Sequence, residues 1–346
     1  MSQIKIIAEI GCNHNGDKEL ARKMVRLAKE CGVDGVKFQT FNSTLLISKY
    51  AKKAEYQKKT TGEDENQLEM TRKLELSYDD YLELQDYAKS LELEVFSTPF
   101  DFESIQFLEN NKQTIWKIPS GEITNLPYLE RIGNFKIENK LIILSTGMAT
   151  IQEIQTALDI LQKHRKNRII ILHCNTEYPT PDSDVNISAI DDLKRNFPNY
   201  EIGYSDHSVG SVAAIMSVTY GVTFIEKHFT LNKNFDGPDH KASATPEELK
   251  ELVDSVRKAE IMLGNGFKQV TQSEMKNKSI ARKSIVAKTN IKSGDIFTEN
   301  NIICKRPGNG ISPMHWYEVL GSVAEKDFNE DELIEMSDIN WEGNHE

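Results

Sequence analysis

Three ionisable residues stand in a row inside the otherwise apolar segment FIEKHFT, 224–230. If this segment is a β-strand, Glu226 and His228 point to one side and Lys227 to the other, because side chains alternate along a strand. The motif YSDHS, upstream in the chain, adds a second histidine, His207. Imidazoles at the ends of neighbouring strands can bind one divalent cation such as Mn, Fe, Co or Zn, with open positions for water or substrate. The alternative is a pair of hydrogen-bonded histidines that binds no metal.

Basic and hydroxyl side chains at other expected strand ends could form an anion site. Lys37 lies in the run VDGVKFQ, and Lys117 interrupts the apolar run TIWKI. Ser145 precedes a Thr-Gly pair that opens an expected helix, whose N-terminal amides would favour an anion. A buried lysine is costly unless its charge is paired. The lysines therefore indicate either a phosphate or carboxylate ligand, or internal ion pairs with Glu9 or Glu122.

Two further residues have types suited to substrate binding. Glu9 ends the first expected strand, directly before GCNHNG, where a carboxylate could act as a general base or bind sugar hydroxyls. Arg306 lies in KRPGNG, near the C-terminus, and its planar guanidinium could reach a substrate if this part of the chain covers a barrel mouth. The alternative for Arg306 is a solvated surface position.

Short apolar runs alternate with longer amphipathic stretches, and these elements must position the candidate side chains. The expected strands are 4–8, 33–39, 93–97, 114–118, 140–145, 168–173, 201–205 and 222–227. Helical periodicity lies between them, as at 17–31, 79–91, 150–164, 187–196 and 247–263. Eight strand–helix units within about 260 residues predict an α/β fold, a (β/α)8 TIM barrel.

A doubly wound open sheet is the alternative architecture. No GxGxxG or GxxxxGK[ST] loop follows the first expected strand, which disfavours that fold. An open sheet also gathers its site at one switch point, whereas here polar groups end every expected strand: Glu9, Lys37, Gln39, Thr98, Lys117, Ser120, Glu122, Ser145, Asn175, Ser205, His207, Glu226 and His228. One convergent rim of this kind is typical of a barrel.

Two stretches differ from this alternating pattern. The polar stretch 41–77 follows the second expected strand, and a loop of that length usually closes over a site or is disordered; its Tyr, Leu and Met content favours a lid with some helix. The stretch 265–280 is polar and lacks strong periodicity, so we interpret it as a linker. Beyond it, SGD and PGNG turns predict a small β-rich domain at 281–346. Its core would be marginal, so we expect it to pack against the barrel or a second subunit.

Composition excludes several classes of function. The chain has 346 residues, 38% hydrophobic and 27% charged, which is ordinary for a globular protein. Its net charge of −11 argues against nucleic-acid binding, because such affinity comes mainly from neutralising phosphates. The four cysteines form no CxxC pair, which favours reduced thiols and a cytoplasmic protein. We expect no membrane association, since no apolar run approaches about 18 residues and no signal-peptide core is apparent.

Ten motifs, in this order along nearly the whole chain, resemble those of the sialic acid synthases, most closely the bacterial N-acetylneuraminate synthases. They are AEIGCNHNG (8–16), VKFQT (36–40), FSTPF (96–100), KIPSGE (117–122), LSTGM (144–148), HCNTEYPTP (173–181), YSDHS (204–208), EKHFT (226–230), GPDH (237–240) and KRPGNG (305–310). The resemblance implies a barrel catalytic domain at 1–264, a linker at 265–280 and a C-terminal SAF (antifreeze-like, β-clip) domain at 281–346. It also implies a domain-swapped homodimer in which the SAF domain closes the partner's barrel.

The activity implied by this resemblance is that of a transferase. Phosphoenolpyruvate, open-chain N-acetylmannosamine and water would give N-acetylneuraminate and phosphate with C–O cleavage. The alternative is a legionaminic or pseudaminic acid synthase that uses a di-acetamido hexose by the same mechanism. A non-catalytic sugar-phosphate sensor is a third hypothesis, disfavoured because Glu9 and both histidines are present together. Other phosphoenolpyruvate aldol-type synthases lack the KRPGNG domain.

The resemblance also carries roles over to individual residues. Phosphoenolpyruvate would be held by Lys37, Thr98, Lys117, Ser120, Ser145, Asn175 and Ser205. The sugar would be held by Gln39, Glu122, Tyr178, Asp239 and Arg306. The catalytic groups would be Glu9, Lys117 and Glu122. His207 and His228 would bind a divalent metal, Mn²⁺ first, with Mg²⁺ or Co²⁺ as alternatives. One departure concerns Thr176, where some relatives have asparagine; Asn175 would take over that contact.

Overall fold

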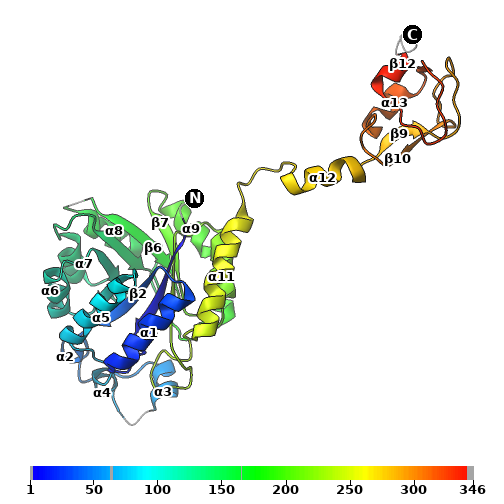
Figure 1. Ribbon diagram of the computed structural model, residues 1–346. Helices are drawn as coiled ribbons and strands as arrows, with labels where there is room; N and C mark the ends of the chain where they lie inside the picture. Colours follow the sequence, from blue (N-terminus) through cyan, green and yellow to red (C-terminus); the bar gives the residue numbers. More distant parts are fainter. Residues whose placement is uncertain (1–2, 63–64, 165, 341–346) are drawn as a thin grey trace. The chain divides into compact units, whose positions relative to one another are not determined.

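The computed structural model describes residues 3–62, 65–164 and 166–340, and the chain divides into two compact units, Met1–Gly264 and Asn265–Glu346 (Figure 1). Two parts of the predicted segments, 63–64 of the lid and 341–346 of the small domain, lie outside the described residues. Among the described residues, no helix combines the length and the apolar character that crossing a membrane requires.

The first unit is built on an eight-stranded parallel sheet within the described residues, with the order β3-β2-β1-β8-β7-β6-β5-β4. The strands are β1 (Lys5–Gly11), β2 (Gly35–Thr40), β3 (Glu94–Pro99), β4 (Ile115–Ile118), β5 (Leu141–Ser145), β6 (Arg168–His173), β7 (Glu201–Asp206) and β8 (Phe224–His228). The end strands β3 and β4 also contact each other, so the sheet curls into a nearly closed barrel. The predicted (β/α)8 fold is confirmed.

A single side chain bridges the seam between β3 and β4. The Gln113 Oε1 atom accepts a hydrogen bond from the Ser97 amide at 2.8 Å, and its Nε2 atom donates to the Ser97 carbonyl at 2.9 Å. Gln113 is buried. Its amide thus satisfies two backbone groups of β3 that would otherwise be costly to bury at the open edge.

Helices follow the strands and pack against the outside of the barrel (Figure 1). They are α1 (Lys18–Cys31), α5 (Tyr78–Ser90), α6 (Phe102–Asn110), α7 (Leu126–Gly133), α8 (Ile151–Gln162), α9 (Ala189–Asn196), α10 (Val212–Thr219) and α11 (Pro246–Leu263). In α1 the Asp17 side chain accepts hydrogen bonds from the first-turn amides, and Gly32 ends the helix in the left-handed region. The buried stripe of each helix faces the apolar outer side chains of the strands, which forms the main core.

The inward side chains change character along the strands. A separate apolar cluster fills the N-terminal part of the lumen with Ile7, Phe96, Ile115, Ile143, Ile170, Leu172 and Phe224. Two residues further along their strands, the same face presents Glu9 after Ile7, Lys117 after Ile115, and Glu226 after Phe224. The period of two therefore places a polar layer directly on an apolar plug, at the C-terminal end of the barrel.

The stretch after β2 contains the short helices α2 (Ser43–Leu46), α3 (Glu55–Thr61) and α4 (Gln67–Arg72). Lys53 organises it from within: its buried Nζ atom donates to the Thr61 hydroxyl at 2.9 Å and to the Gly62 carbonyl at 3.0 Å. The Glu65 carboxylate lies 3.4 Å from the same nitrogen. The helical content expected for this stretch is present.

The second unit has its own core, formed by residues such as Ile285, Phe297, Ile302, Val319, Phe328 and Ile334. Its regular elements are α12 (Gln272–Ala281), α13 (Trp316–Val319), the antiparallel pair β9 (Ser284–Ala287) and β10 (Ile302–Lys305), and the pair β11 (Val323–Ala324) and β12 (Ile339–Asn340). Part of the predicted linker is thus helical. The side chains of α12 are exposed, so the sequence shows no apolar periodicity that would predict this helix. Thr271 and Glu274 nevertheless form a capping box at its start.

Candidate active site

One cavity of about 550 Å³ opens at the C-terminal ends of the barrel strands. Its lining includes most of the predicted site residues: Glu9, Lys37, Gln39, Thr98, Lys117, Ser120, Glu122, Ser145, Tyr178, Ser205, His207, His228 and Asp239. Two predicted residues are placed elsewhere. Arg306 belongs to the second unit, where its Nε atom donates to the Ala281 carbonyl. Asn175 is not in the lining, which includes its neighbour Thr176 instead.

Four buried charges form the floor of this cavity. Lys37 Nζ lies 2.8 Å from Glu9 Oε2 and 3.7 Å from Glu226 Oε2. Lys117 Nζ lies 3.7 Å from the other oxygen of Glu226. Gln39 Nε2 donates to Glu9 Oε1 at 3.1 Å. Negative and positive charges therefore alternate in the order Glu9, Lys37, Glu226, Lys117. Lys117, the last of this series, has the weakest pairing.

The proton affinities follow from this arrangement. Burial raises the pKa of Glu9, and the nearby Lys37 offsets only part of that effect. Burial acts in the same direction on Glu226, but Lys117 and Lys37 outweigh it and hold the pKa of Glu226 below its usual range. Burial tends to lower the pKa of Lys37, yet Glu226 and Glu9 raise it overall. For Lys117, burial prevails and the pKa is lowered. A further anion beside Lys117 would restore its charge balance.

Hydroxyl groups and a close backbone approach surround the lysines. Thr98 Oγ1 accepts from Lys37 Nζ at 3.1 Å, and Ser205 Oγ donates to Glu226 Oε1 at 3.0 Å. Ser120 Oγ accepts from the Gly147 amide at 3.0 Å. A Cβ atom at Gly147 would lie 2.6 Å from Thr176 Cγ2 and 2.9 Å from that hydroxyl, so a larger residue here would require these side chains to shift. Cations and small donors of this kind suit a phosphate or carboxylate.

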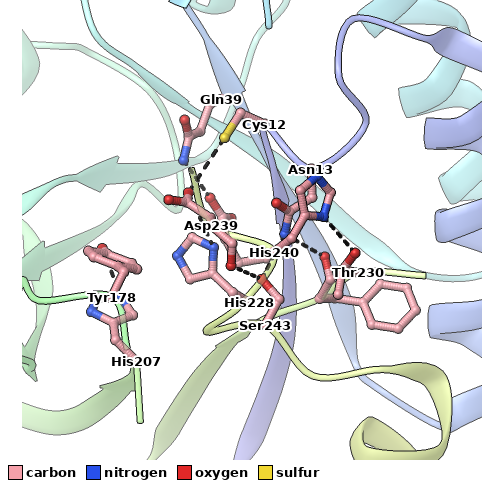
Figure 2. Close-up of polar contacts among 12 residues, drawn as sticks. Cys12, Asn13, Gln39, Tyr178, His207, His228, Thr230, Asp239, His240 and Ser243 are labelled. Carbon is pink, nitrogen blue, oxygen red and sulfur yellow. Dashed lines mark hydrogen bonds and ion pairs between the residues drawn. The ribbon is translucent and has the colours of Figure 1, made fainter. Parts of the chain in front are cut away.

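The two predicted histidines face each other across the ends of β7 and β8, with ring centroids 5.2 Å apart (Figure 2). His207 Nδ1 is hydrogen-bonded to the Asn175 carbonyl. Its Nε2 atom lies 3.2 Å from Ser205 Oγ and 3.3 Å from the Tyr178 hydroxyl. The Tyr178 ring stacks on His207 at 4.2 Å between centroids. Asn175 therefore orients an imidazole through its backbone, while its own side chain accepts from the Glu177 amide.

The donor set fits a divalent cation with open coordination positions. Burial lowers the pKa of His207 to about 4 and that of His228 well below its usual value, so both imidazoles are neutral, as metal ligands must be. His228 Nδ1 is buried and has no hydrogen-bond partner among the described residues, and Asp239 Oδ2 lies 3.7 Å from it. Within the described ranges, no group of three or more His, Cys, Asp or Glu side chains is arranged to hold a metal. Two imidazoles would therefore leave the remaining positions to water or substrate.

Buried polar contacts hold the loop that carries Asp239 in place (Figure 2). Ser243 Oγ donates to the Asp239 carbonyl at 2.7 Å, and Asn13 Nδ2 donates to Ser243 Oγ at 2.8 Å. Cys12 Sγ lies 3.5 Å from Asp239 Oδ2. Burial raises the pKa of Asp239 to about 6, and the contact with Cys12 offsets part of this effect.

Several lining residues were missed by the sequence-based prediction. Cys12 and Tyr56 are among them, and the Tyr56 ring lies 5.3 Å from Tyr178. Others come from the stretch after β2: Leu46, Ile47, Gln57, Gln67, Met70 and Leu74. Their types carry no catalytic signature, so only the expected lid position of 41–77 could have pointed to them. Glu226 also lines the cavity, and the alternation within FIEKHFT did indicate its inward direction.

Comparisons with known proteins agree with this geometry. The sequence model of the NeuB family matches residues 24–268, and that of the SAF domain matches residues 282–340. The N,N'-diacetyllegionaminic acid synthase of Campylobacter jejuni is 50% identical over 96% of this chain and 99% of its own length. The synthase of the same name from Legionella pneumophila is 43% identical over 92% of this chain and 89% of its own.

A solved structure is similar over much of the chain. The crystal structure of the N-acetylneuraminic acid synthetase of Leptospira borgpetersenii superposes with a TM-score of 0.69 and 33% identity. The match covers 80% of this chain and 90% of that one.

Replacing Glu226 tests the charge balance of the floor. We expect Glu226→Gln to lower the free energy of unfolding by about 3–5 kcal/mol, because Lys37 and Lys117 lose a shared buried counterion. Inorganic phosphate should restore part of this loss, since it supplies the missing negative charge. Thermal denaturation with and without phosphate measures both effects, and Glu251→Gln on the exposed face of α11 is the matched control. If phosphate stabilised the variant no more than the parent, the lysines would not form an anion site.

Proposed function

The chain belongs to the NeuB family and ends in a SAF domain, and we propose that within this family it condenses phosphoenolpyruvate with a di-acetamido hexose, as an N,N'-diacetyllegionaminic acid synthase. The protein is a transferase of the sialic acid synthase type. The observation that carries the choice of sugar is the identity of 50% and 43% to two synthases of that name, against 33% to an N-acetylneuraminic acid synthetase. N-acetylmannosamine was the first substrate expected from the sequence. The relatives favour the alternative, a di-acetamido hexose.

The residue types in the wall of the cavity favour a sugar with a second acetamido group. An acetamido substituent combines a methyl group with an amide, whereas a hydroxyl is wholly polar. The wall from the stretch after β2 offers both kinds of partner, apolar side chains and primary amides: Leu46, Ile47, Met70, Leu74, Gln57 and Gln67. A hydroxyl placed against the apolar part of this wall would lose its hydrogen bonds to water.

Phosphoenolpyruvate would occupy the basic side of the floor. Lys37 and Lys117 would neutralise its phosphate and carboxylate, and the hydroxyls of Thr98, Ser120, Ser145 and Ser205 would contact them. The lowered pKa of Lys117 supports this placement, because an arriving anion would stabilise the charged form. Asn175 would contribute indirectly, since its carbonyl orients His207.

We further propose that His207 and His228 hold a divalent cation, Mn²⁺ first and Mg²⁺ or Co²⁺ as alternatives. When bound, it would supply Lewis-acid polarisation of the open-chain aldehyde. Gln39, Glu122, Tyr178 and Asp239 line the cavity where they would bind sugar hydroxyl and amide groups. The raised pKa of Asp239, about 6, suits a carboxyl group that exchanges hydrogen bonds with such hydroxyls.

We propose the following reaction at these positions. The C2=C3 electron pair of phosphoenolpyruvate attacks the aldehyde carbon and forms the new C–C bond. The aldehyde C=O pair moves to its oxygen, which takes a proton from solvent water. Positive charge develops at C2, which water then attacks. The buried Glu9, with its raised pKa and its side chain oriented by Gln39, accepts the proton that water loses. The hydroxyl on the tetrahedral C2 then gives its proton to the departing phosphate, so that C2 becomes a ketone as the C–O bond to phosphate breaks.

Phosphate release with a panel of sugars tests the proposed substrate. The purified full chain is assayed with phosphoenolpyruvate and Mn²⁺ against N-acetylmannosamine, the di-acetamido hexoses of the legionaminic and pseudaminic routes, and mannose. We expect the legionaminic precursor to give the highest kcat/KM. A preference for N-acetylmannosamine would restore the sialic acid assignment, and no turnover with any sugar by folded, metal-loaded protein would favour a sensor.

Glu9→Gln tests the assigned base. The substitution keeps the size of the side chain but removes its proton acceptor, so we expect kcat to fall by about 10²–10⁴-fold while phosphoenolpyruvate still binds. Single-turnover kinetics and calorimetry measure the two quantities, with Glu251→Gln as the control. A variant with the parent's kcat would exclude Glu9 as the base.

The family resemblance leads us to propose a homodimer in which Arg306 acts on the partner's sugar. Arg306→Ala should then raise KM for the sugar more than it lowers kcat. Mixing and reannealing this variant with Glu9→Gln should produce one competent site per heterodimer, because that site combines an intact Glu9 with an intact Arg306. If mixing recovers no activity, Arg306 acts within its own chain or not at all.

A further inference from the structure

A buried ion pair lies directly behind the two histidines. Lys227 Nζ is 2.9 Å from Asp206 Oδ2, and the side chains are 1% and 0% exposed. Asp206 is the last residue of β7 and directly precedes His207, and Lys227 precedes His228 in β8. Because side chains alternate along a strand, the ion pair lies on the outer face of the barrel wall and the histidines on the inner face. None of the proposed steps of the reaction uses this pair.

The pair makes several further buried hydrogen bonds. Asp206 Oδ1 accepts from the Ser208 amide at 2.9 Å, from the Ser208 hydroxyl at 2.6 Å and from the Tyr204 hydroxyl at 3.2 Å. Lys227 Nζ also donates to the Ser208 carbonyl. Both charges thus bind Ser208, the residue after His207, and the backbone there can shift little without breaking a buried contact.

The position of the pair in the sheet is equally specific. Asp206 and Lys227 are register partners, and they form the last pair of the β7–β8 ladder. Beyond this point His207 is held by the Thr180 amide, which donates to its carbonyl at 2.9 Å, and His228 by the Ala244 amide at 2.8 Å. The ion pair is therefore the last pairing between β7 and β8, directly before His207 and His228.

Stability alone is a poor explanation for such a pair. Removing two charges from water costs several kcal/mol per ion, and a well-packed apolar pair of similar volume is often as stable. A charged pair differs from an apolar pair in its directionality, because it fixes two strand ends in one register and one orientation.

We propose that the Asp206–Lys227 ion pair positions the two imidazoles for a shared cation, by locking the ends of β7 and β8 and the turn at Ser208. The inference rests on the proposed metal site of His207 and His228. Asp206 and Lys227 are positioning residues, acting through the backbone on ligands they do not touch with their own side chains. Residues behind a metal ligand commonly change metal affinity by about 10–100-fold when replaced.

The test replaces the ion pair with apolar side chains, Asp206→Leu with Lys227→Met, in the full chain. We expect this double variant to remain folded by circular dichroism but to bind Mn²⁺ about 10–100-fold more weakly in calorimetry without substrates. The Co²⁺ absorption spectrum should also change, because the angle between the imidazoles is no longer fixed. KM for phosphoenolpyruvate should stay near that of the parent.

The matched control is Arg168→Met with Glu201→Leu, which removes an exposed ion pair between β6 and the opposite end of β7. It should leave Mn²⁺ affinity and the Co²⁺ spectrum unchanged. His207→Ala and His228→Ala report on the metal site itself. If the parent binds no Mn²⁺, or both alanine variants bind it normally, the proposed metal site fails.

A failure of the positioning role would look different. The inference is overturned if the histidine variants lose Mn²⁺ while the folded Leu–Met variant keeps the parent's affinity and Co²⁺ spectrum. If that variant does not fold, Asp206→Asn, which preserves the shape of the side chain, is measured in the same way with the same two outcomes.

Discussion

Lys37 and Lys117 both depend on the carboxylate of Glu226, and this dependence organises the centre of the barrel. Each lysine is almost fully buried, so its charge must be balanced by neighbours within the lumen. Lys37 obtains a close second partner in Glu9 at 2.8 Å, whereas Lys117 has Glu226 at 3.7 Å. The floor is therefore balanced on one side and deficient in negative charge on the other. The deficit lies at Lys117, beside which we propose that the substrate anion binds.

The layers of the lumen separate stability from chemistry. The apolar plug of inward side chains supports the strands from below, and the charged layer lies two residues above it on the same strands. Because the plug excludes water, the charges above it interact through a medium of low polarity, where each pairing is stronger. The shifts in the pKa of Glu9, Glu226 and Lys117 all originate from this placement.

The floor and the wall of the cavity come from different kinds of segment. The floor is supplied by strand ends, whose geometry the barrel dictates, and it carries the residues that we propose bind phosphoenolpyruvate. The wall is supplied largely by the short helices between β2 and α5, where Lys53 binds the end of α3. A segment outside the barrel ladder can change its side chains without disturbing the strands, so it is suited to distinguishing one amino sugar from another.

The local pattern of the chain was sufficient to predict the barrel, the inward direction of Glu226 and His228, and the strand-end positions of Lys37 and Lys117, because strand periodicity and strand–helix alternation are properties of neighbouring residues. The tertiary structure alone revealed that Gln113 closes the β3–β4 seam, that the Tyr56 ring contacts Tyr178, and that Asn175 turns its side chain away while its carbonyl orients His207. Each of these contacts joins segments that are separate along the chain or depends on the rotation of one peptide group. Periodicity assigns a side chain to a face of its own element, but the partner it meets there is set by how the elements pack.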